Sequence, residues 1–196
     1  VQTIGHLPID LNNLPIDYLV ASAHKFHGPK GIGFLFVRKE RRFTPLLLGG
    51  AQEKDLRAGT ENVAGIIGMV KAFELAHQDL RKTELHFELL KTYLIEEINT
   101  RFNFITINGT QENALQNIIS LSIAPEKSNA MLLFSLDLKG ICISGGSACA
   151  SGSVKSHVTE ALTMDPKQGV LRVSLSRFNT KEEITILINT FEEIFN

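Results

Sequence analysis

The sequence predicts an α/β chain of two domains, the second of α+β type, and three observations support this. Short apolar runs suited to strands alternate with segments of helical periodicity along the 196 residues. Hydrophobic residues make up 43% of the chain and charged residues 21%, as is usual for a globular protein with a buried core. A charged stretch at residues 78–83 predicts the boundary between residues 1–78 and residues 79–196.

The first domain is predicted to contain two strands and a helix. The apolar run at residues 17–23 is suited to a buried strand, and the run at residues 32–37 is predicted to be the second strand. The glycines and proline of residues 26–33 predict a turn between them. A helix is predicted further along, because apolar residues recur there at helical spacing. These residues are Val63, Ile66, Ile67, Val70 and Phe73.

The second domain is predicted to begin with a helix and to continue with short strands. The buried face of that helix is predicted to comprise Phe87, Leu90, Leu94 and Ile98. The remaining elements are strands at residues 104–107, 118–123, 141–144 and 170–175, with a helix over residues 128–138.

A capping box marks the start of the last predicted helix. Thr180 is the N-cap and Glu183 follows three residues later, so each side chain can bond the backbone of the other. The buried stripe of this helix is predicted to be Ile184, Leu187, Ile188, Phe191 and Ile194.

Charge and composition exclude several classes of function. The 20 Lys and Arg residues balance 21 Asp and Glu residues, so the general basic field of a nucleic-acid binder is absent. No apolar stretch approaches the ~20 residues that span a membrane. The two cysteines are too few for a disulfide framework, and they indicate a reducing compartment such as the cytoplasm.

Lys25 is the first candidate for chemistry. It lies at the end of the first apolar run, where flanking residues can draw its amine out of bulk water. Desolvation favours the neutral amine, and a neutral amine can form a Schiff base with a carbonyl compound. The alternative is a surface lysine in a turn, which composition alone favours.

Cys149 lies in a segment of Ser, Gly and Ala at residues 144–153. Such small residues leave a thiol open and mobile, which suits a nucleophile that travels to its target, so we expect mobility within residues 145–156. An incidental thiol in a linker is an equal alternative. Cys142 has apolar neighbours on both sides and is expected to be an inert core thiol.

Two further positions could bind anions. Thr60 is expected to precede the first helix directly, where its hydroxyl and the helix amides could hold a phosphate, although a plain N-cap is the simpler interpretation. Arg172 could capture a carboxylate in bidentate fashion, with Arg177 as the next candidate, but each alone would be taken for a surface charge. No metal site is predicted, because the His and Cys spacing lacks a zinc pattern.

Four motifs, taken together and in this order, resemble the cysteine desulfurase family of the NifS and IscS type, whose members are fold-type-I enzymes that use pyridoxal phosphate (PLP). The resemblance covers nearly the whole chain. It implies that residues 1–78 form the later part of the PLP-binding large domain and residues 79–196 the small domain. The motifs are SAHKFHGPKGIG at 22–33, GGAQEKDLRAGTEN at 49–62, SGGSAC at 144–149 and RVSL at 172–175.

The resemblance implies a set of cofactor contacts. Lys25 would attach PLP covalently, while Ser22 and His24 would help to hold its phosphate. Gln2 would lie beside the phenolic oxygen of the PLP ring. Thr60 would reach the phosphate of the cofactor in a second subunit, which implies a homodimer.

The resemblance also implies a reaction. Arg172 would bind the carboxylate of L-cysteine, and Cys149 would accept its sulfur as a persulfide, leaving L-alanine. The sulfur would pass to an iron–sulfur scaffold or another acceptor protein, for iron–sulfur cluster assembly or tRNA thiolation, without direct binding to nucleic acid or membrane. Selenocysteine as the substrate is an alternative.

A second hypothesis concerns the chain by itself. In the family, the half that precedes the position of Val1 supplies the group stacked on the PLP ring and the Asp at the ring nitrogen. Without that half, PLP binding is expected to be weak or absent. The chain alone would then be an inactive fragment or a scaffold-binding module.

Overall fold

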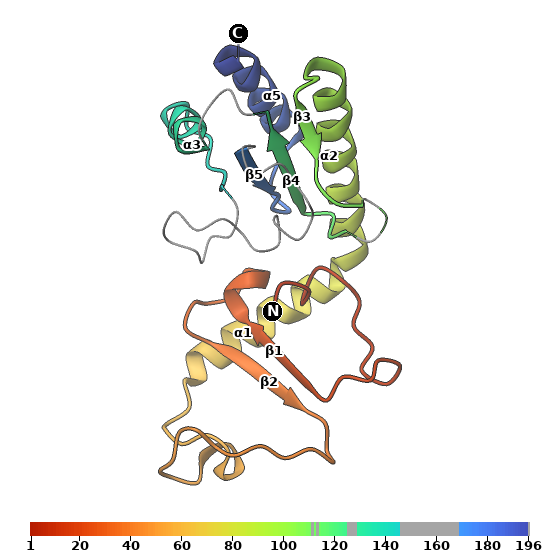
Figure 1. Cartoon of the computed structure of the whole chain (residues 1–196). Helices are drawn as coiled ribbons and strands as arrows, with labels where there is room; N and C mark the ends of the chain where they lie inside the picture. The colour runs from red at the N-terminus through yellow and green to blue at the C-terminus, as the bar shows by residue number, and fades with distance from the viewer. Residues whose placement is uncertain (111, 113, 125–128, 146–168, 196) are drawn as a thin grey trace. The chain divides into compact units, whose positions relative to one another are not determined.

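The computed structural model describes residues 1–195 except for 111, 113, 125–128 and 146–168 (Figure 1). Its contacts divide the chain into two compact units, Val1–Thr83 and Glu84–Asn196. The division falls at the end of the charged stretch 78–83. No helix among the described residues is both long and apolar enough to cross a membrane.

The first unit contains an antiparallel strand pair and a long helix. The pair holds β1 and β2 in a register that places Tyr18 opposite Val37 and Ser22 opposite Gly33. Its core contains Ala21, Ala23, Phe26 and Met69, with Ile4 from the start of the chain. The elements are β1 (Tyr18–Ser22), the 3-10 turn η1 (Ala23–Phe26), β2 (Gly33–Val37), the 3-10 turn η2 (Gln52–Asp55) and α1 (Val63–Gln78).

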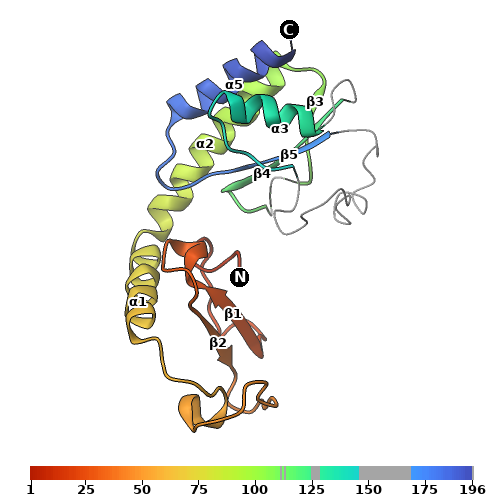
Figure 2. The same ribbon diagram turned by 90° about the vertical axis from the view of Figure 1, so that its left-hand side faces the viewer.

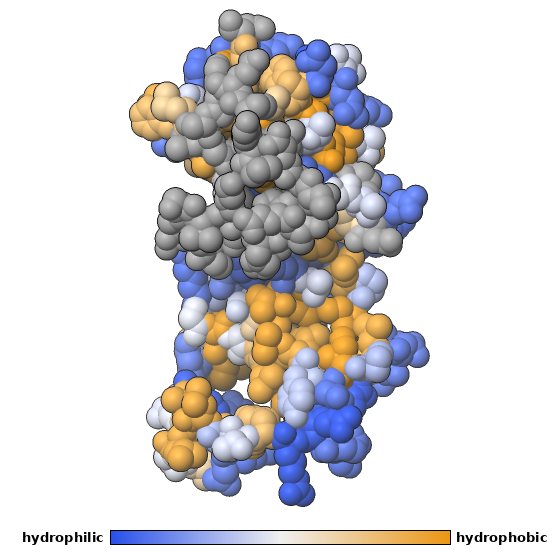
Figure 3. Space-filling view, in the orientation of Figure 1, coloured by the Kyte–Doolittle hydropathy of each residue, from blue (hydrophilic) through white to orange (hydrophobic). Residues whose placement is uncertain are grey.

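The first strand was predicted to be buried, and this expectation is wrong for β1. Ala21 is buried on one face, but Val20 on the other face is 51% exposed. A two-stranded sheet has only one covered face here, so alternate side chains of an apolar run reach solvent. Figure 3 shows the resulting apolar surface over the β1–β2 hairpin.

Helix α1 forms where predicted but buries a different face. Val63 and Ile67, which belong to the predicted apolar face, are 61% and 65% exposed. The helix packs instead through Gly65 and Met69, with Ala72 and Ala76 partly buried on the same face. The periodicity misleads because α1 has apolar residues on several faces. The face with small residues packs on the core, because those residues let the helix lie close to it.

The second unit packs helices on one face of a sheet. The described strands form an antiparallel sheet in the order β3-β4-β5, and Figure 2 shows α2, α3 and α5 along one face of it. The elements are α2 (Leu80–Arg101), β3 (Ile105–Ile107), β4 (Ile118–Ile123), α3 (Asn129–Leu138), β5 (Gly169–Ser174) and α5 (Lys181–Phe195). Helix α2 begins at Leu80, before the boundary between the units.

Alternation along the strands separates the core from a polar face. Ile119, Leu121 and Ile123 of β4 are buried in the core, as are Leu171 and Val173 of β5. The helices contribute their predicted stripes to the same core, including Leu94, Ile98, Ile188 and Phe191. The intervening residues of both strands lie on the opposite face of the sheet.

The strand predicted at residues 141–144 is wrong. The chain there makes a single bridge, between Ser144 and Arg172, and forms no regular strand. Ile141 and Ile143 still pack on the core, but Cys142 between them is exposed. The prediction of a core thiol is therefore also wrong, because alternation directs Cys142 away from the core side.

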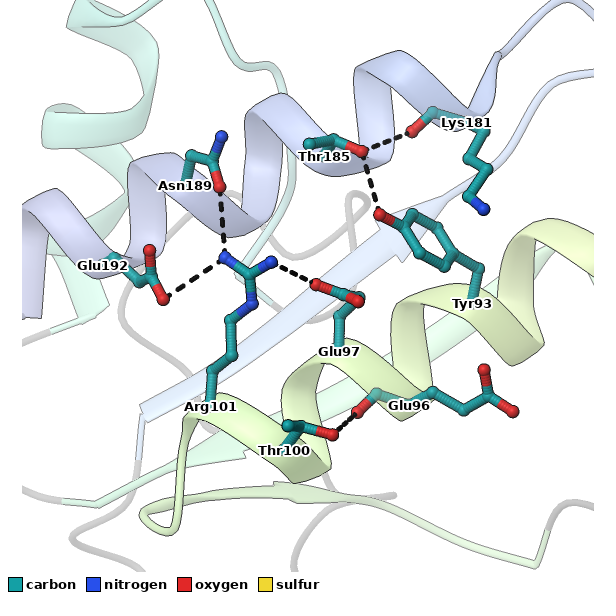
Figure 4. A network of polar contacts seen from close by, with 9 residues as sticks. All are labelled: Tyr93, Glu96, Glu97, Thr100, Arg101, Lys181, Thr185, Asn189 and Glu192. Atoms are coloured by element: carbon teal, nitrogen blue, oxygen red, sulfur yellow. Dashed lines mark hydrogen bonds and ion pairs between the residues drawn. The ribbon is translucent and has the colours of Figure 1, made fainter.

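A polar network joins α2 to α5 over this core (Figure 4). The Arg101 guanidinium pairs with Glu97 of its own helix at 2.6 Å and with Glu192 of α5 at 3.3 Å. It also donates to Asn189 Oδ1 at 3.2 Å. The Arg101 guanidinium thus links the end of α2 to α5.

We expect the aromatic core beneath this network to dominate the stability of the second unit. Phe191 is 0% exposed and meets Phe102 edge to face with ring centroids 6.1 Å apart. Phe191→Ala should lower the free energy of unfolding by about 3–5 kcal/mol, measured by urea denaturation. Ile186→Ala on the same helix, where Ile186 is 56% exposed, should cost less than about 1 kcal/mol. Equal losses in the two variants would contradict this packing.

The predicted capping box of α5 is confirmed. Glu183 N donates to Thr180 Oγ1 at 3.4 Å, and Thr180 N donates to Glu183 Oε2 at 3.0 Å. Asn179 Nδ2 donates to the same carboxylate oxygen at 2.7 Å. The hydrogen bond from Asn179, and then that from the Thr180 backbone, hold the pKa of Glu183 below its usual value.

The capping box predicts a pH dependence of stability. Because the folded state lowers the pKa of Glu183, the stability it adds is complete above the unfolded pKa of about 4.3 and is lost as pH falls through the folded pKa. Wild type and Glu183→Leu should therefore differ in unfolding free energy at pH 7 and converge under acid conditions. A difference that stays constant down to pH 2 would exclude this role of the carboxylate.

Candidate functional site

Lys25 lies in a tight turn directly after β1. The turn η1 closes through His27, whose backbone takes the left-handed conformation at φ 66°, and Gly28 N donates to Ala23 O at 2.8 Å. Ala23 and Phe26 are buried beneath the turn, which anchors it to the core of the first unit. His6 Nε2 contacts the carbonyl oxygen of Lys25 at 3.2 Å and so ties the turn to the start of the chain.

Three side chains of this turn carry reactive or polar groups. Ser22 is the N-cap residue, but its side chain makes no capping hydrogen bond. Lys25 is partly buried and His24 is exposed. In the part of the chain that the structure describes, the hydroxyl, the imidazole and the amine make no hydrogen bond or ion pair, so they are available to a ligand.

Gln2 and Thr60 are both exposed, and no described hydrogen bond joins them to the Lys25 turn. The expectation that Thr60 directly precedes the helix is wrong. The N-cap of α1 is Asn62, whose Oδ1 accepts from Gly65 N at 3.0 Å. Asn is a strong N-cap residue, so it starts the helix two positions later and leaves the Thr60 hydroxyl free of the capping role.

Arg172 occupies the middle of β5, on the sheet face opposite the core. Its neighbours along the strand, Leu171 and Val173, are buried among the core residues. Arg172 is paired in register with Ser120 of β4, and its backbone also bridges to Ser144. Arg172 is therefore held in place by β4 on one side and by the backbone bridge to Ser144 on the other.

The guanidinium of Arg172 differs from an ordinary surface charge. Its Nε is buried and has no hydrogen-bond partner among the described residues. A buried donor without a partner is costly, and such groups are often those that bind a ligand. A carboxylate would satisfy this nitrogen and match the planar fork of the side chain.

Cys149 lies outside the described residues, and so does most of the segment 145–156 for which mobility was expected. Both expectations therefore stay predictions. The last described residue before the gap at 146–168 is Gly145, one residue after the Ser144–Arg172 bridge. Four residues lie between Ser144 and Cys149, so five steps of chain allow a reach of at most about 18 Å.

Sequence reasoning missed a polar cluster beside Arg172. Asn108 Nδ2 donates to Ser120 Oγ at 3.0 Å, and Ser122 Oγ donates to Asn108 Oδ1 at 2.9 Å. The alternation of serine with apolar residues in β4 could have indicated the polar face. Asn108 gave no such signal, because an Asn before a Gly reads only as a turn.

Among the described residues, no group of three or more His, Cys, Asp and Glu side chains is placed to hold a metal ion. The first unit instead presents a lysine amine, a hydroxyl and an imidazole at the Lys25 turn, and the second unit presents the Arg172 guanidinium. These groups suit an anionic organic ligand and covalent chemistry at an amine.

Comparison with known proteins identifies the family. The sequence profile of the aminotransferase class-V family matches residues 1–187. The chain belongs to the aminotransferase class-V family. The predicted resemblance to cysteine desulfurases of the NifS and IscS type is confirmed by the relatives below.

Two curated relatives of this class-V chain carry the name cysteine desulfurase IscS. That of Dictyoglomus turgidum is 43% identical over 197 residues, which cover 99% of this chain and 50% of the relative. That of Methanosarcina thermophila is 42% identical over 197 residues and is covered to 48%. The chain thus spans about half the length of these relatives.

Solved structures agree with the predicted fold. The NifS-like protein from Rickettsia africae matches 100% of the chain with a TM-score of 0.90 at 30% identity, and the chain covers 52% of it. The α/β fold class of PLP-dependent fold-type-I enzymes is therefore confirmed for the part of that fold which the chain spans. The domain assignments of residues 1–78 and 79–196 remain predictions.

Exposure of Cys142 can be measured directly. In a Cys149→Ser variant, we expect Cys142 to react with a thiol reagent such as DTNB without denaturant, within about tenfold of the rate of a free thiol, because it is exposed. Cys142→Ser in the same background removes the signal and serves as the control. A reaction that requires denaturant would show that Cys142 is buried, as the sequence predicted.

Proposed function

We propose that this chain is the C-terminal part of a PLP-dependent cysteine desulfurase, which releases L-alanine from L-cysteine and holds the sulfur as a persulfide on Cys149. The observation that carries the proposal is the turn after β1, where Ser22, His24 and Lys25 present unused polar groups. The relatives named cysteine desulfurase support it along 99% of the chain.

The donors of this turn fit PLP. A primary amine suits the aldehyde of the cofactor, and a hydroxyl with an imidazole N–H suits its phosphate. Lys25 would hold the cofactor covalently, with Ser22 and His24 at the phosphate. When bound, PLP supplies the electron sink at the substrate Cα that no protein side chain provides.

Gln2 and Thr60 would contact the cofactor from outside the turn. Gln2 would bind the phenolic oxygen, and Thr60 would bind the phosphate of the cofactor in the other subunit of a homodimer. Both residues are exposed in this chain, which is compatible with contacts to groups that the chain itself does not contain. The apolar surface of the first unit, including Leu46 at 93% and Leu48 at 82% exposed, is likewise suited to burial in a larger assembly.

Arg172 would bind the substrate, and Lys25 would transfer its proton. The Arg172 guanidinium would bind the carboxylate through parallel hydrogen bonds, which fixes the orientation of the amino acid. The Lys25 amine would accept the proton from the substrate Cα and return it later, as a general base and then a general acid.

Cys149 would take the sulfur. Its thiolate attacks the substrate thiol sulfur, so that an S–S bond forms as the bond between Cβ and sulfur breaks. The electron pair of the broken bond stays with the carbon fragment, which gains a proton and leaves as alanine. An iron–sulfur scaffold or another acceptor protein in the cytoplasm would then receive the sulfur.

A second candidate function concerns the chain by itself. The chain spans about half the length of its relatives, and a two-stranded sheet such as β1–β2 is marginal on its own. Alone, it would bind PLP weakly or not at all and would act as an inactive fragment or a module that binds a scaffold protein.

Covalent attachment at Lys25 tests the proposed function. In the full-length protein loaded with PLP, borohydride reduction and peptide mapping should place the cofactor on Lys25, because its amine lies in the turn with Ser22 and His24. Lys25→Ala should abolish the attachment, whereas Lys30→Ala, which changes an exposed lysine of the same segment, should keep it. Mapping to Lys30 would overturn the assignment.

Sulfur transfer can be followed separately. After addition of L-cysteine to the full-length holoenzyme, mass spectrometry should find one extra sulfur atom on Cys149. Cys149→Ser should bind PLP normally and form no persulfide, because a hydroxyl cannot accept sulfur in this way. An adduct on the exposed Cys142, with Cys149 unmodified, would show that Cys149 is not the nucleophile.

A further inference from the structure

A row of polar residues crosses the sheet of the second unit at the position of Arg172. Asn108 N donates to Ser120 O at 2.9 Å, Ser120 is opposite Arg172, and Arg172 bridges to Ser144. Residues that face each other across antiparallel strands project from the same side of a sheet. These four residues therefore share the sheet face opposite the core.

Asn108 is the most constrained member of this row. Its amide nitrogen donates to Ser120 Oγ at 3.0 Å, and its amide oxygen accepts from Ser122 Oγ at 2.9 Å. Ser122 is only 1% exposed, so this hydrogen bond is protected from water. One side chain thus fixes two hydroxyls of β4, including the one opposite Arg172.

The backbone geometry brings Ser120 close to the stem of Arg172. The N–H and C=O of Arg172 bind Ser144, at 2.6 Å and 3.3 Å. The pair formed by Ser120 and Arg172 is therefore of the type without direct hydrogen bonds, in which side chains approach most closely, with Cβ atoms about 4.5–5.5 Å apart. This pairing places the serine side chain beside the first part of the arginine.

Packing has to hold the inner part of this side chain, because its Nε makes no hydrogen bond among the described residues. The Nε of Arg172 is buried without a partner among the described residues. A long side chain without polar restraints keeps its rotamer freedom unless its neighbours are fixed. The neighbour on the β4 side is Ser120, and Asn108 holds it.

We propose that Asn108 is a positioning residue for Arg172, which it orients for carboxylate capture through Ser120. The identity of the captured carboxylate rests on the proposed function, but the alignment of Arg172 does not. Bidentate capture requires the guanidinium plane to be set before the ligand arrives, so a loosened Arg172 binds the substrate less well.

Nuclear magnetic resonance tests the alignment without any reaction. In the 15N-labelled full chain, the Nε–H signal of Arg172, assigned by its loss in Arg172→Lys, should show a high heteronuclear NOE. Asn108→Ala should lower this NOE by about half or more, because the hydrogen bond that holds the Ser120 side chain beside the arginine stem is lost. Ser120→Ala, a smaller change that leaves Asn108 in place, should lower it in the same direction.

Thr106→Ala is the matched control. Thr106 lies on the same strand pair, opposite Ser122, but it is exposed and makes no hydrogen bond among the described side chains. The Arg172 signal should be unchanged in this variant. An Arg172 NOE that stays at the wild-type value in both Asn108→Ala and Ser120→Ala would overturn the proposal.

Kinetics of the full-length holoenzyme test the consequence. Asn108→Ala should raise KM for L-cysteine about tenfold and change kcat less than about threefold, a split expected for lost ground-state alignment. In Arg172→Lys, the further change to Asn108→Ala should have little effect, because the two act as one unit. Additive losses would show that Asn108 supports only the fold. A wild type inactive on L-cysteine would refute the proposed function, and the NMR comparison would still decide the role of Asn108.

Discussion

Strand β4 is the element on which the second unit depends, because it is paired along both edges. β3 joins it from one side through Ile105 to Ile107, and β5 joins it from the other along its whole length. A one-residue slip in either register would exchange the two faces of the sheet. The buried leucine and isoleucine side chains would then reach water, and the polar row would enter the core.

This register is also what gives Arg172 its surroundings. The same alternation that buries Leu171 and Val173 places Arg172 among serines and an asparagine on the other face. The core and the polar face around Arg172 therefore depend on the same hydrogen-bond ladder between β4 and β5. A change in the core that disturbed the pairing would disturb the site without touching it.

The sequence was most informative where a local rule acts alone. The capping box of α5 and the stripes of α2 and α5 follow from spacing within one segment, and the structure reproduces them. Predictions were wrong where two local rules compete for the same segment. α1 has more apolar residues than one face can use, Asn62 displaces Thr60 as the N-cap, and the apolar pair around Cys142 packs without forming a strand. The contacts of Asn108 were beyond reach, because they depend on which strands become neighbours.

The site itself was predictable only as a set of motifs in order. Lys25, Arg172 and Thr60 each read as ordinary residues when taken alone, and their combination indicated the family. The structure adds the physical reasons for two of them. The Lys25 turn stands on buried Ala23 and Phe26, and Arg172 carries a buried nitrogen without a partner.

The bridge between Ser144 and Arg172 is made by backbone atoms alone, and this has a consequence for sequence variation. The side chain at position 144 takes no part in the two hydrogen bonds, so many residue types can occupy it and keep the link. Proline is the exception, because it lacks the N–H that reaches the carbonyl oxygen of Arg172. Position 144 should therefore accept most side chains but not proline. A mutational scan of this segment would show proline as the single excluded residue there.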